Sequence, residues 1–176
     1  TNYLTPNIYL QKLIKDNSNS IDKMIEKSIK KETKEDEFFL FGKKYTLQYN
    51  KTAKDITINA HEIIIENKQK LDNYLDLLIK DTFSTHLNYW YNRFQENIPT
   101  PNLKIRKMKS RWGVCNTKNN NITLNYYLYK YDIECLDYVI VHELSHFLEG
   151  NHSKNFWRVV EKYYPNYKEI RKKLRS

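Results

Sequence analysis

The chain has 176 residues, a formal net charge of +9 and two cysteines. This length suffices for one domain with its own core, and the sequence lacks both the apolar run of about eighteen residues that a membrane helix needs and the pattern of a secretory leader. Two cysteines without C-x-x-C spacing argue against a disulfide framework, so we expect a soluble, cytoplasmic protein.

The excess positive charge lies in the C-terminal part of the chain. Residues 101–176 carry 15 Lys and Arg against 7 Asp and Glu, whereas residues 1–100 carry 15 against 14. A positive field attracts nucleic acid or acidic protein, and a solvated basic surface explains the same composition equally well. DNA therefore stays an alternative partner.

The chain is expected to divide into an N-terminal extension, residues 1–37, and one domain, residues 38–176. The extension is polar and lysine-rich, and a helix is predicted where apolar residues recur at helical spacing. These residues are Ile21, Met24, Ile25 and Ile29.

Short strands are predicted after the extension and again in the middle of the chain. The pattern of β-branched and aromatic residues indicates four strands that form a small antiparallel sheet. Their ranges are 38–41, 45–49, 56–58 and 63–65. Two more strands are predicted at 103–108 and 122–125, separated by a polar Asn-rich turn.

Helices are predicted between and after these strands. Apolar residues at intervals of three and four indicate a long amphipathic helix over 68–97, which ends before two prolines. A largely buried helix is predicted over 133–149, with Gly150 ending it. Two shorter helices follow, one capped by Ser153 and one that begins at Pro165.

The buried helix carries His142-Glu143-Leu144-Ser145-His146. Two histidines four residues apart lie on one face of a helix, so both imidazoles reach one metal ion. Zn²⁺ is the expected cofactor, because it lowers the pKa of a bound water towards about 7 and polarises a carbonyl. Glu143 is the candidate general base, which takes a proton from that water.

The third metal ligand is expected to be His152, six residues beyond His146. A short loop is enough to bring it back, which costs less ordering than a second helix. Glu161 and Glu169 remain alternatives, since another class of zinc peptidase supplies a glutamate from downstream. The metzincin signature has the same histidine spacing, but its glycine would stand at Glu149 and a later methionine is lacking.

From about Phe38 to Leu174 the chain resembles the YgjP-like metallopeptidases, which are related to the SprT-like proteins. Four motifs in register carry the resemblance: Lys109-Ser110-Arg111-Trp112-Gly113 with Cys115, Ile122-Thr123-Leu124-Asn125, the segment from Asp137 to His146, and Asn151-His152-Ser153 with Phe156-Trp157. Val114 departs from the serine usual in the family.

The resemblance implies an α+β, zincin-like metallopeptidase domain with an HExxH active-site helix. It also implies metal ligands at His142, His146 and His152, with Glu143 catalytic. The expected function is a zinc-dependent hydrolase that cleaves peptide bonds in a polypeptide substrate. The alternatives are another amide as substrate, and a zinc-stabilised module, or a protease, that DNA recruits.

Several other residues have an expected role. Trp112 is expected to be core, with Arg111 paired to a carboxylate, and the alternative is that both line the substrate cleft or contact nucleic acid. The strand Ile122–Asn125 is a candidate edge to which a peptide adds as a further strand. Phe156 and Trp157 are expected to hold His152 in place. One of Tyr126, Tyr127 and Tyr129 is a candidate oxyanion stabiliser.

Overall fold

The structure, a computed structural model, describes residues 37–175. The predicted helix in the N-terminal extension lies outside the described residues. The strands are β1 (Glu37–Leu40), β2 (Lys43–Tyr49), β3 (Thr57–Ile58), β4 (Glu62–Ile65), β5 (Asn102–Arg106), β6 (Gly113–Asn116) and β7 (Asn121–Asn125). The helices are α3 (Lys68–Tyr91), η1 (Tyr126–Lys130), α4 (Ile133–Ser145), α5 (Lys154–Tyr163) and α6 (Tyr167–Lys173). The predicted α+β class is confirmed.

The first sheet has the strand order β1-β2-β4-β3. A tight turn at Phe41 and Gly42, both with positive φ, joins β1 to β2, as the right-handed twist of a hairpin requires. The Phe41 N–H donates to the Tyr129 carbonyl over 2.6 Å, which attaches this hairpin to η1. Because β2 and β4 run parallel, the sheet is mixed and not purely antiparallel as predicted.

The second sheet has the order β5-β7-β6, with β5 parallel and β6 antiparallel to β7. The sequence did not predict β6, whose four residues include a glycine and an asparagine and lack the alternation of a strand. The segment 107–112 crosses the end of β7, so β5 and β6 lie on opposite edges. This crossover explains why the sheet contains a parallel pair.

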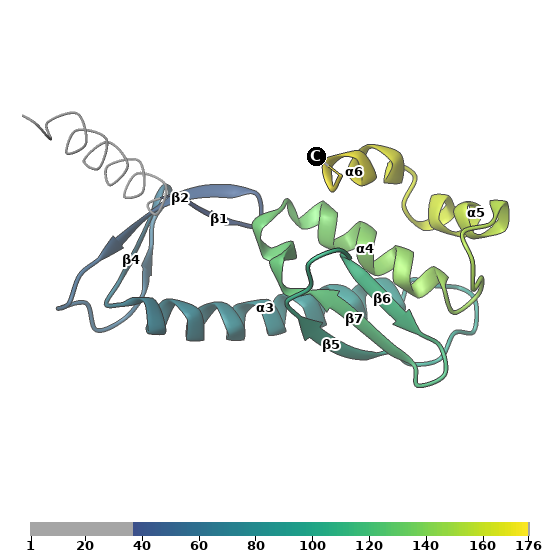
Figure 1. The fold of residues 1–176 in the computed structure, drawn as a ribbon, viewed down its shortest axis with the longest axis horizontal. Coiled ribbons are helices and arrows are strands. Elements are labelled where there is room, and N and C mark those ends of the chain that lie inside the picture. Colours follow the sequence, from purple (N-terminus) through teal and green to yellow (C-terminus); the bar gives the residue numbers. More distant parts are fainter. Residues whose placement is uncertain (1–36, 176) are drawn as a thin grey trace, which may run out of the picture.

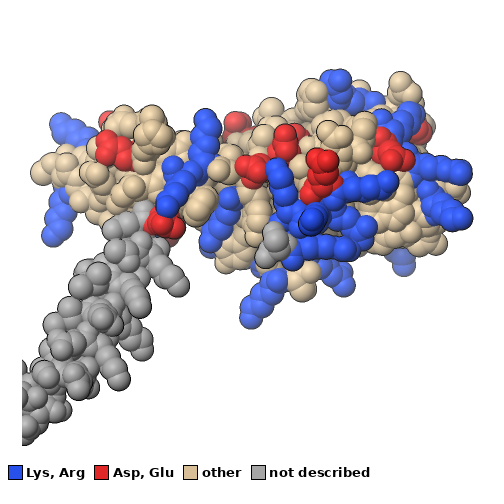
Figure 2. All heavy atoms as spheres, turned by 90° about the horizontal axis from the view of Figure 1, so that it is seen from above, with Lys and Arg blue, Asp and Glu red and all other residues tan. Residues whose placement is uncertain are grey.

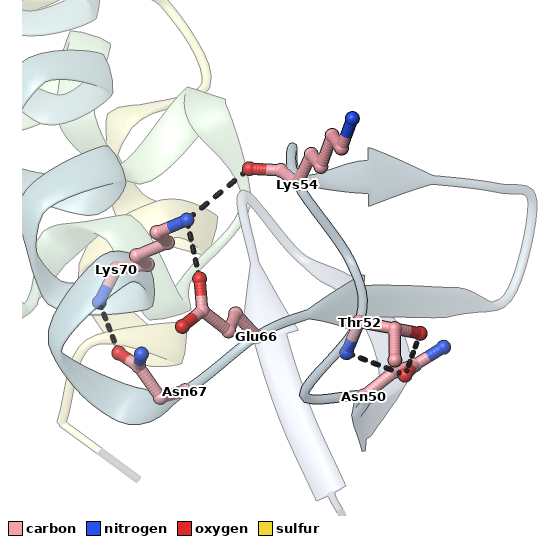
Figure 3. Close-up of polar contacts among 6 residues, drawn as sticks. All are labelled: Asn50, Thr52, Lys54, Glu66, Asn67 and Lys70. Carbon is pink, nitrogen blue, oxygen red and sulfur yellow. Dashed lines mark hydrogen bonds and ion pairs between the residues drawn. The ribbon is translucent and has the colours of Figure 1, made fainter.

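The long helix α3 runs beneath the molecule and connects the first sheet to the rest of the fold (Figure 1). Its N-cap is Asn67, whose side chain accepts a hydrogen bond from the Lys70 N–H over 3.0 Å. The Lys70 ammonium pairs with Glu66 and donates to the Lys54 carbonyl over 3.2 Å (Figure 3). These contacts attach the start of α3 to the loop between β2 and β3.

Helix α3 ends at Tyr91, six residues before the predicted end. Two apolar residues beyond it, Phe94 and Ile98, are buried from a non-helical segment. The Phe94 ring stacks on Tyr163 of α5 with the ring centroids 4.0 Å apart. Packing against α5 therefore replaces the last predicted turns of the helix.

Helix α4 lies in the middle of the domain, between α3 on one side and α5 and α6 on the other (Figure 1). Nine of its thirteen residues are buried. Its α-helical part ends at Ser145, and His146 to Leu148 continue in tighter turns with bonds to the third preceding carbonyl. The predicted end of this helix at Gly150 is therefore wrong, and Gly150 has no positive φ. Over the described residues, no helix is long and apolar enough to span a membrane.

Candidate metal centre

Three histidine rings converge at the end of α4. His142 lies in the last turns of the helix and His146 is its C-cap, while His152 comes from the loop before α5. The Nε2 atoms of His142 and His152 are 3.0 Å apart. One ring nitrogen from each of the three residues lies within 4.8 Å of the other two. The predicted triad is therefore brought together.

The surroundings leave these nitrogens free to bind a cation. The Nδ1 of His146 lies 3.1 Å from the Glu149 carbonyl, and donation to that carbonyl leaves the lone pair of Nε2 unused. Burial, together with the neighbouring His146 and His152 rings, lowers the pKa of His142 to about 3. His142 is thus neutral at neutral pH, which is the form that binds metals.

The donor set suits zinc. Two imidazoles whose Nε2 atoms face each other at 3.0 Å can share either one proton or one cation. Zinc is commonly bound by histidine nitrogens, and three protein ligands leave a fourth position for water or substrate. The residues present therefore fit a catalytic zinc ion.

Aromatic residues of α5 hold the triad. Phe156 is fully buried, and its ring lies 4.6–4.9 Å from all three histidine rings. Trp157 stacks on His152 with the ring centroids 5.7 Å apart. The side chain of Ser153 caps α5 by accepting the Phe156 N–H over 3.2 Å. These contacts are those expected of residues that orient His152.

Glu143 lies beside the triad and is 5% exposed. Burial raises the pKa of Glu143 to about 8, against the lowering effect of the Cys115 backbone N–H and of Arg111. The carboxyl lies directly over Gly113, where a Cβ would come within 2.5 Å of Glu143 Oε1. The Glu143 side chain therefore packs against the first residues of β6.

A cavity of about 720 Å³ opens beside the histidines and Glu143. Its wall includes the segment from Trp112 to Cys115, and Arg171 with Leu174 near the end of α6. Burial and the nearby Glu143 charge raise the pKa of the Cys115 thiol to about 12. Cys115 therefore stays a thiol at neutral pH and is a poor nucleophile.

A family model described as the YgjP-like metallopeptidase domain matches residues 5–176. The chain belongs to the YgjP-like metallopeptidase family. The match extends further towards the N-terminus than the resemblance that begins near Phe38. It makes the protein a member of a family of metal-dependent peptidases, in agreement with the triad and the cavity.

Two solved structures of metallopeptidase zymogens are similar to this YgjP-like chain. One is abylysin of Pyrococcus abyssi, with 26% identity and a TM-score of 0.43, covering 55% of this chain and 90% of that one. The other is jannalysin of Methanocaldococcus jannaschii, with 29% identity and a TM-score of 0.42, covering 55% and 92%. None of the curated proteins matches the chain.

The alternative ligands in this YgjP-like domain lie away from the triad. The exposed Glu161 lies 3.8 Å from Lys168 in an ion pair, and Glu169 is exposed on α6. Among the described residues, the three histidines are the group of side chains placed to share a metal. The geometry therefore favours His152 over either glutamate.

Other predicted residues have mixed outcomes. Trp112 is partly buried against the core, as predicted, and its indole donates to the Leu174 carbonyl over 3.0 Å. Arg111 lines the cavity and makes no ion pair among the described residues, but its charge acts on the Glu143 carboxyl and works to lower the pKa of that group, so the predicted carboxylate neighbour is present without a direct bond. The strand Ile122–Asn125 is β7, which is paired on both sides, so the edge strand at the cavity is β6.

The tyrosines also differ from expectation. Tyr126, Tyr127 and Tyr129 do not line the cavity, whereas Tyr138 does. Burial raises the pKa of Tyr138 to about 12, so its hydroxyl keeps its proton. Helical spacing was a usable signal, since Tyr138 lies one turn before His142 on α4.

Asn125 is a positioning residue that sequence reasoning did not single out. It is 3% exposed, and its side-chain amide donates to the carbonyls of Met108 and Arg111 over 2.9 and 2.8 Å. These bonds fix the crossover segment 107–112, which leads to Gly113. They thereby fix the start of β6, against which Glu143 packs. The signal available in the sequence was that Asn125 is the polar residue that ends the motif Ile122-Thr123-Leu124-Asn125.

Proposed function

We propose that the protein is a zinc-dependent peptidase with His142, His146 and His152 as metal ligands and Glu143 as general base. One observation carries the proposal: three convergent histidine nitrogens and a buried carboxyl lie on the wall of the same cavity. A metal-dependent hydrolase needs this combination, because the ion and the base must act on the same water.

Zinc would polarise the scissile carbonyl and lower the pKa of water at the site. Glu143 accepts the proton of the attacking water on its carboxylate and then donates it to the leaving amine. The raised pKa suits this exchange, since a base that must return its proton works best with a pKa near the working pH. Gly113 and the Cys115 N–H keep the carboxyl in position.

The substrate is proposed to bind in extended form along β6. In the described sheet β6 pairs with β7 alone, so the backbone groups on its other edge can bind a peptide, except for the Cys115 N–H, which bonds to Glu143. Gly113, Val114 and Cys115 line the cavity beside Glu143. An added strand at this edge would bring its scissile carbonyl close to the histidines.

Replacement of Glu143 by Gln tests the function. The variant should bind zinc as the parent does and lose at least about a hundredfold in kcat, because a positioned base contributes roughly 10²–10⁴. Glu161→Gln, on the exposed side of α5, is the matched control and should keep full activity. Full activity of Glu143→Gln would refute the role of this residue.

The substrate panel should contain an unfolded protein, small peptides and non-peptide amides. Cleavage of the first two alone supports a peptidase, and cleavage of amides alone supports the rival hydrolase. Zinc content, measured in protein purified without added metal, completes the test of the cofactor.

A second proposed function is association with DNA. Lys and Arg side chains gather on the face above α6 (Figure 2), and residues 101–176 carry most of the net positive charge. Phosphate contacts would make binding steeply dependent on salt. Titration with duplex and single-stranded DNA over a range of salt tests this function, and no binding at low salt would remove it.

A further inference from the structure

Three arginines from two distant parts of the chain lie on the wall of the cavity. Arg111 precedes β6, whereas Arg171 and Arg175 belong to α6 and the residues that end it. Within residues 37–175, no ion pair or side-chain hydrogen bond involves any of these guanidinium groups. Arg111 acts on the nearby Glu143 charge, whereas Arg171 and Arg175 have no carboxylate partner among these residues and are available to bind one.

The position of Arg171 is set by aromatic stacking. Its guanidinium carbon lies 4.6 Å from the centre of the Trp157 ring, and Trp157 also stacks on His152 and on Tyr167. A stacked guanidinium keeps its N–H groups free at its edge, where they donate in a planar fork. Arg171 is thus separated from a proposed metal ligand by a single ring.

The end of α6 is attached to the loop that carries Arg111. The Trp112 indole donates to the Leu174 carbonyl over 3.0 Å, and Leu174 is 9% exposed. The Arg175 N–H bonds to the Lys172 carbonyl over 3.1 Å, which continues the turn beyond the helix. Arg171 of α6 and the backbone of Arg175 just beyond it are therefore held beside the cavity.

The charge of the cavity wall is one-sided. Glu143 is the one carboxyl residue of the wall, against three arginines. A carboxylate in this cavity would accept two parallel hydrogen bonds from a guanidinium, which is the strongest polar pairing open to it. Lysine or arginine side chains of a substrate would meet repulsion there.

We propose that Arg171 and Arg175 bind a carboxylate of the polypeptide substrate close to the scissile bond. This inference rests on the proposed peptidase function and defines its substrate class. Extended peptides advance about 3.4 Å per residue. The Arg171 guanidinium, separated from His152 by the Trp157 ring, would therefore bind a residue roughly one to three positions from the cleaved bond. The carboxylate is either an acidic side chain or the free C-terminus.

The experiment uses the full chain loaded with zinc and sets of matched peptides. Each set keeps one sequence and places Glu or Gln at one position on either side of the cleaved bond. Every peptide is made with a free and with an amidated C-terminus. We expect kcat/KM to be about tenfold or more higher for one Glu peptide over its Gln partner, or for the free over the amidated form, since bonds between charged groups contribute roughly 1.5–3 kcal/mol.

Variants connect the preference to the two arginines. Arg171→Gln with Arg175→Gln should bring the Glu to Gln ratio, or the free to amidated ratio, close to one. Arg175→Glu should reverse the preference, so that a peptide with Lys at the same position is cleaved faster than its Glu partner. Arg158→Gln, an exposed arginine of α5 outside the cavity wall, is the matched control and should keep the parent ratio.

The two proposals fail in different ways. If no peptide is cleaved and Glu143→Gln behaves as the parent, the peptidase function itself is wrong. If peptides are cleaved through Glu143 and all ratios are near one, the arginine site is wrong and the peptidase stands. A preference that survives the double variant, or competition by an oligonucleotide but by no acidic peptide, would also overturn the arginine site.

Discussion

Gly113 faces the Glu143 side chain so closely that a Cβ on Gly113 would stand 2.5 Å from Oε1 and 2.7 Å from Cγ of Glu143. Gly113→Ala must therefore displace the carboxyl. We expect kcat/KM to fall about a hundredfold, the cost typical of an error near 1 Å at a reacting group. Zinc content should not change, because the three histidines are not affected.

Gly150→Ala is the control for Gly113→Ala in unfolding measurements. No atom lies within 4 Å of a Cβ at Gly150, so its free energy of unfolding should change by less than about 0.5 kcal/mol. Gly113→Ala should lose about 1–3 kcal/mol through overpacking. Equal stability and equal activity of the two variants would contradict the contact.

Replacement of His152 by Ala should weaken zinc binding while α4 stays folded. The remaining His142 and His146 provide two ligands, and we expect the zinc dissociation constant to rise by more than about a hundredfold, beyond the effect of losing an outer partner. Competition with a chromophoric chelator measures it. Glu161→Ala and Glu169→Ala are the controls, and a comparable loss in either would transfer the third ligand to that glutamate.

Trp112→Phe should reduce activity more than stability. The substitution keeps a ring against Tyr131 but removes the indole N–H that bonds to the Leu174 carbonyl. The end of α6 would then move, and with it one wall of the cavity. We expect a rise in KM of about five- to tenfold, in line with the roughly 1 kcal/mol that one hydrogen bond contributes.

Trp90→Phe is the matched variant for Trp112→Phe. Its indole donates to Asp137 over 2.7 Å, on the side of α4 that faces α3. Trp90→Phe also removes one hydrogen bond, so it should lower the free energy of unfolding by about as much as Trp112→Phe does. It should leave KM as in the parent. A rise in KM in both variants would mean that general loosening, and not the position of α6, is responsible.

Glu96 should stabilise the folded protein at neutral pH, and this contribution should be lost in acid. Partial burial alone would raise the pKa of Glu96, but hydrogen bonds from Lys162 and Tyr163 lower it below its usual value. A depressed pKa in the folded state adds stability above the pKa of the unfolded chain, and this stability is lost as pH falls through the folded value. Denaturant unfolding between pH 7 and the acid range should show the loss.

Glu96→Gln should show a smaller loss of stability in acid than the parent. Glu161→Gln, whose carboxylate lies 3.8 Å from Lys168 on the surface, should follow the parent curve. Parallel curves for the parent and Glu96→Gln would show that this contact between α5 and the segment after α3 carries no linkage to pH.

Local spacing along the chain was enough to predict the helices and the core of the site. The periodicity of apolar residues predicted α3 and α4, because a helix that packs on one face must repeat every three or four residues, and the capping residue Ser153 predicted α5. The four-residue interval between His142 and His146 is likewise a property of one helix. The expectation of the α+β class came from the resemblance to the YgjP-like metallopeptidases.

The tertiary structure decided what depends on contacts between distant residues. Strand β6 has little strand signal of its own and forms because β7 and the Asn125 amide hold the segment before it. Burial of Glu143 over Gly113 joins residues thirty positions apart. The approach of Arg171 to the histidines passes through stacked rings on α5 and α6. Periodicity describes only which residues share a face of one element, so the packing of the folded chain had to supply these relationships.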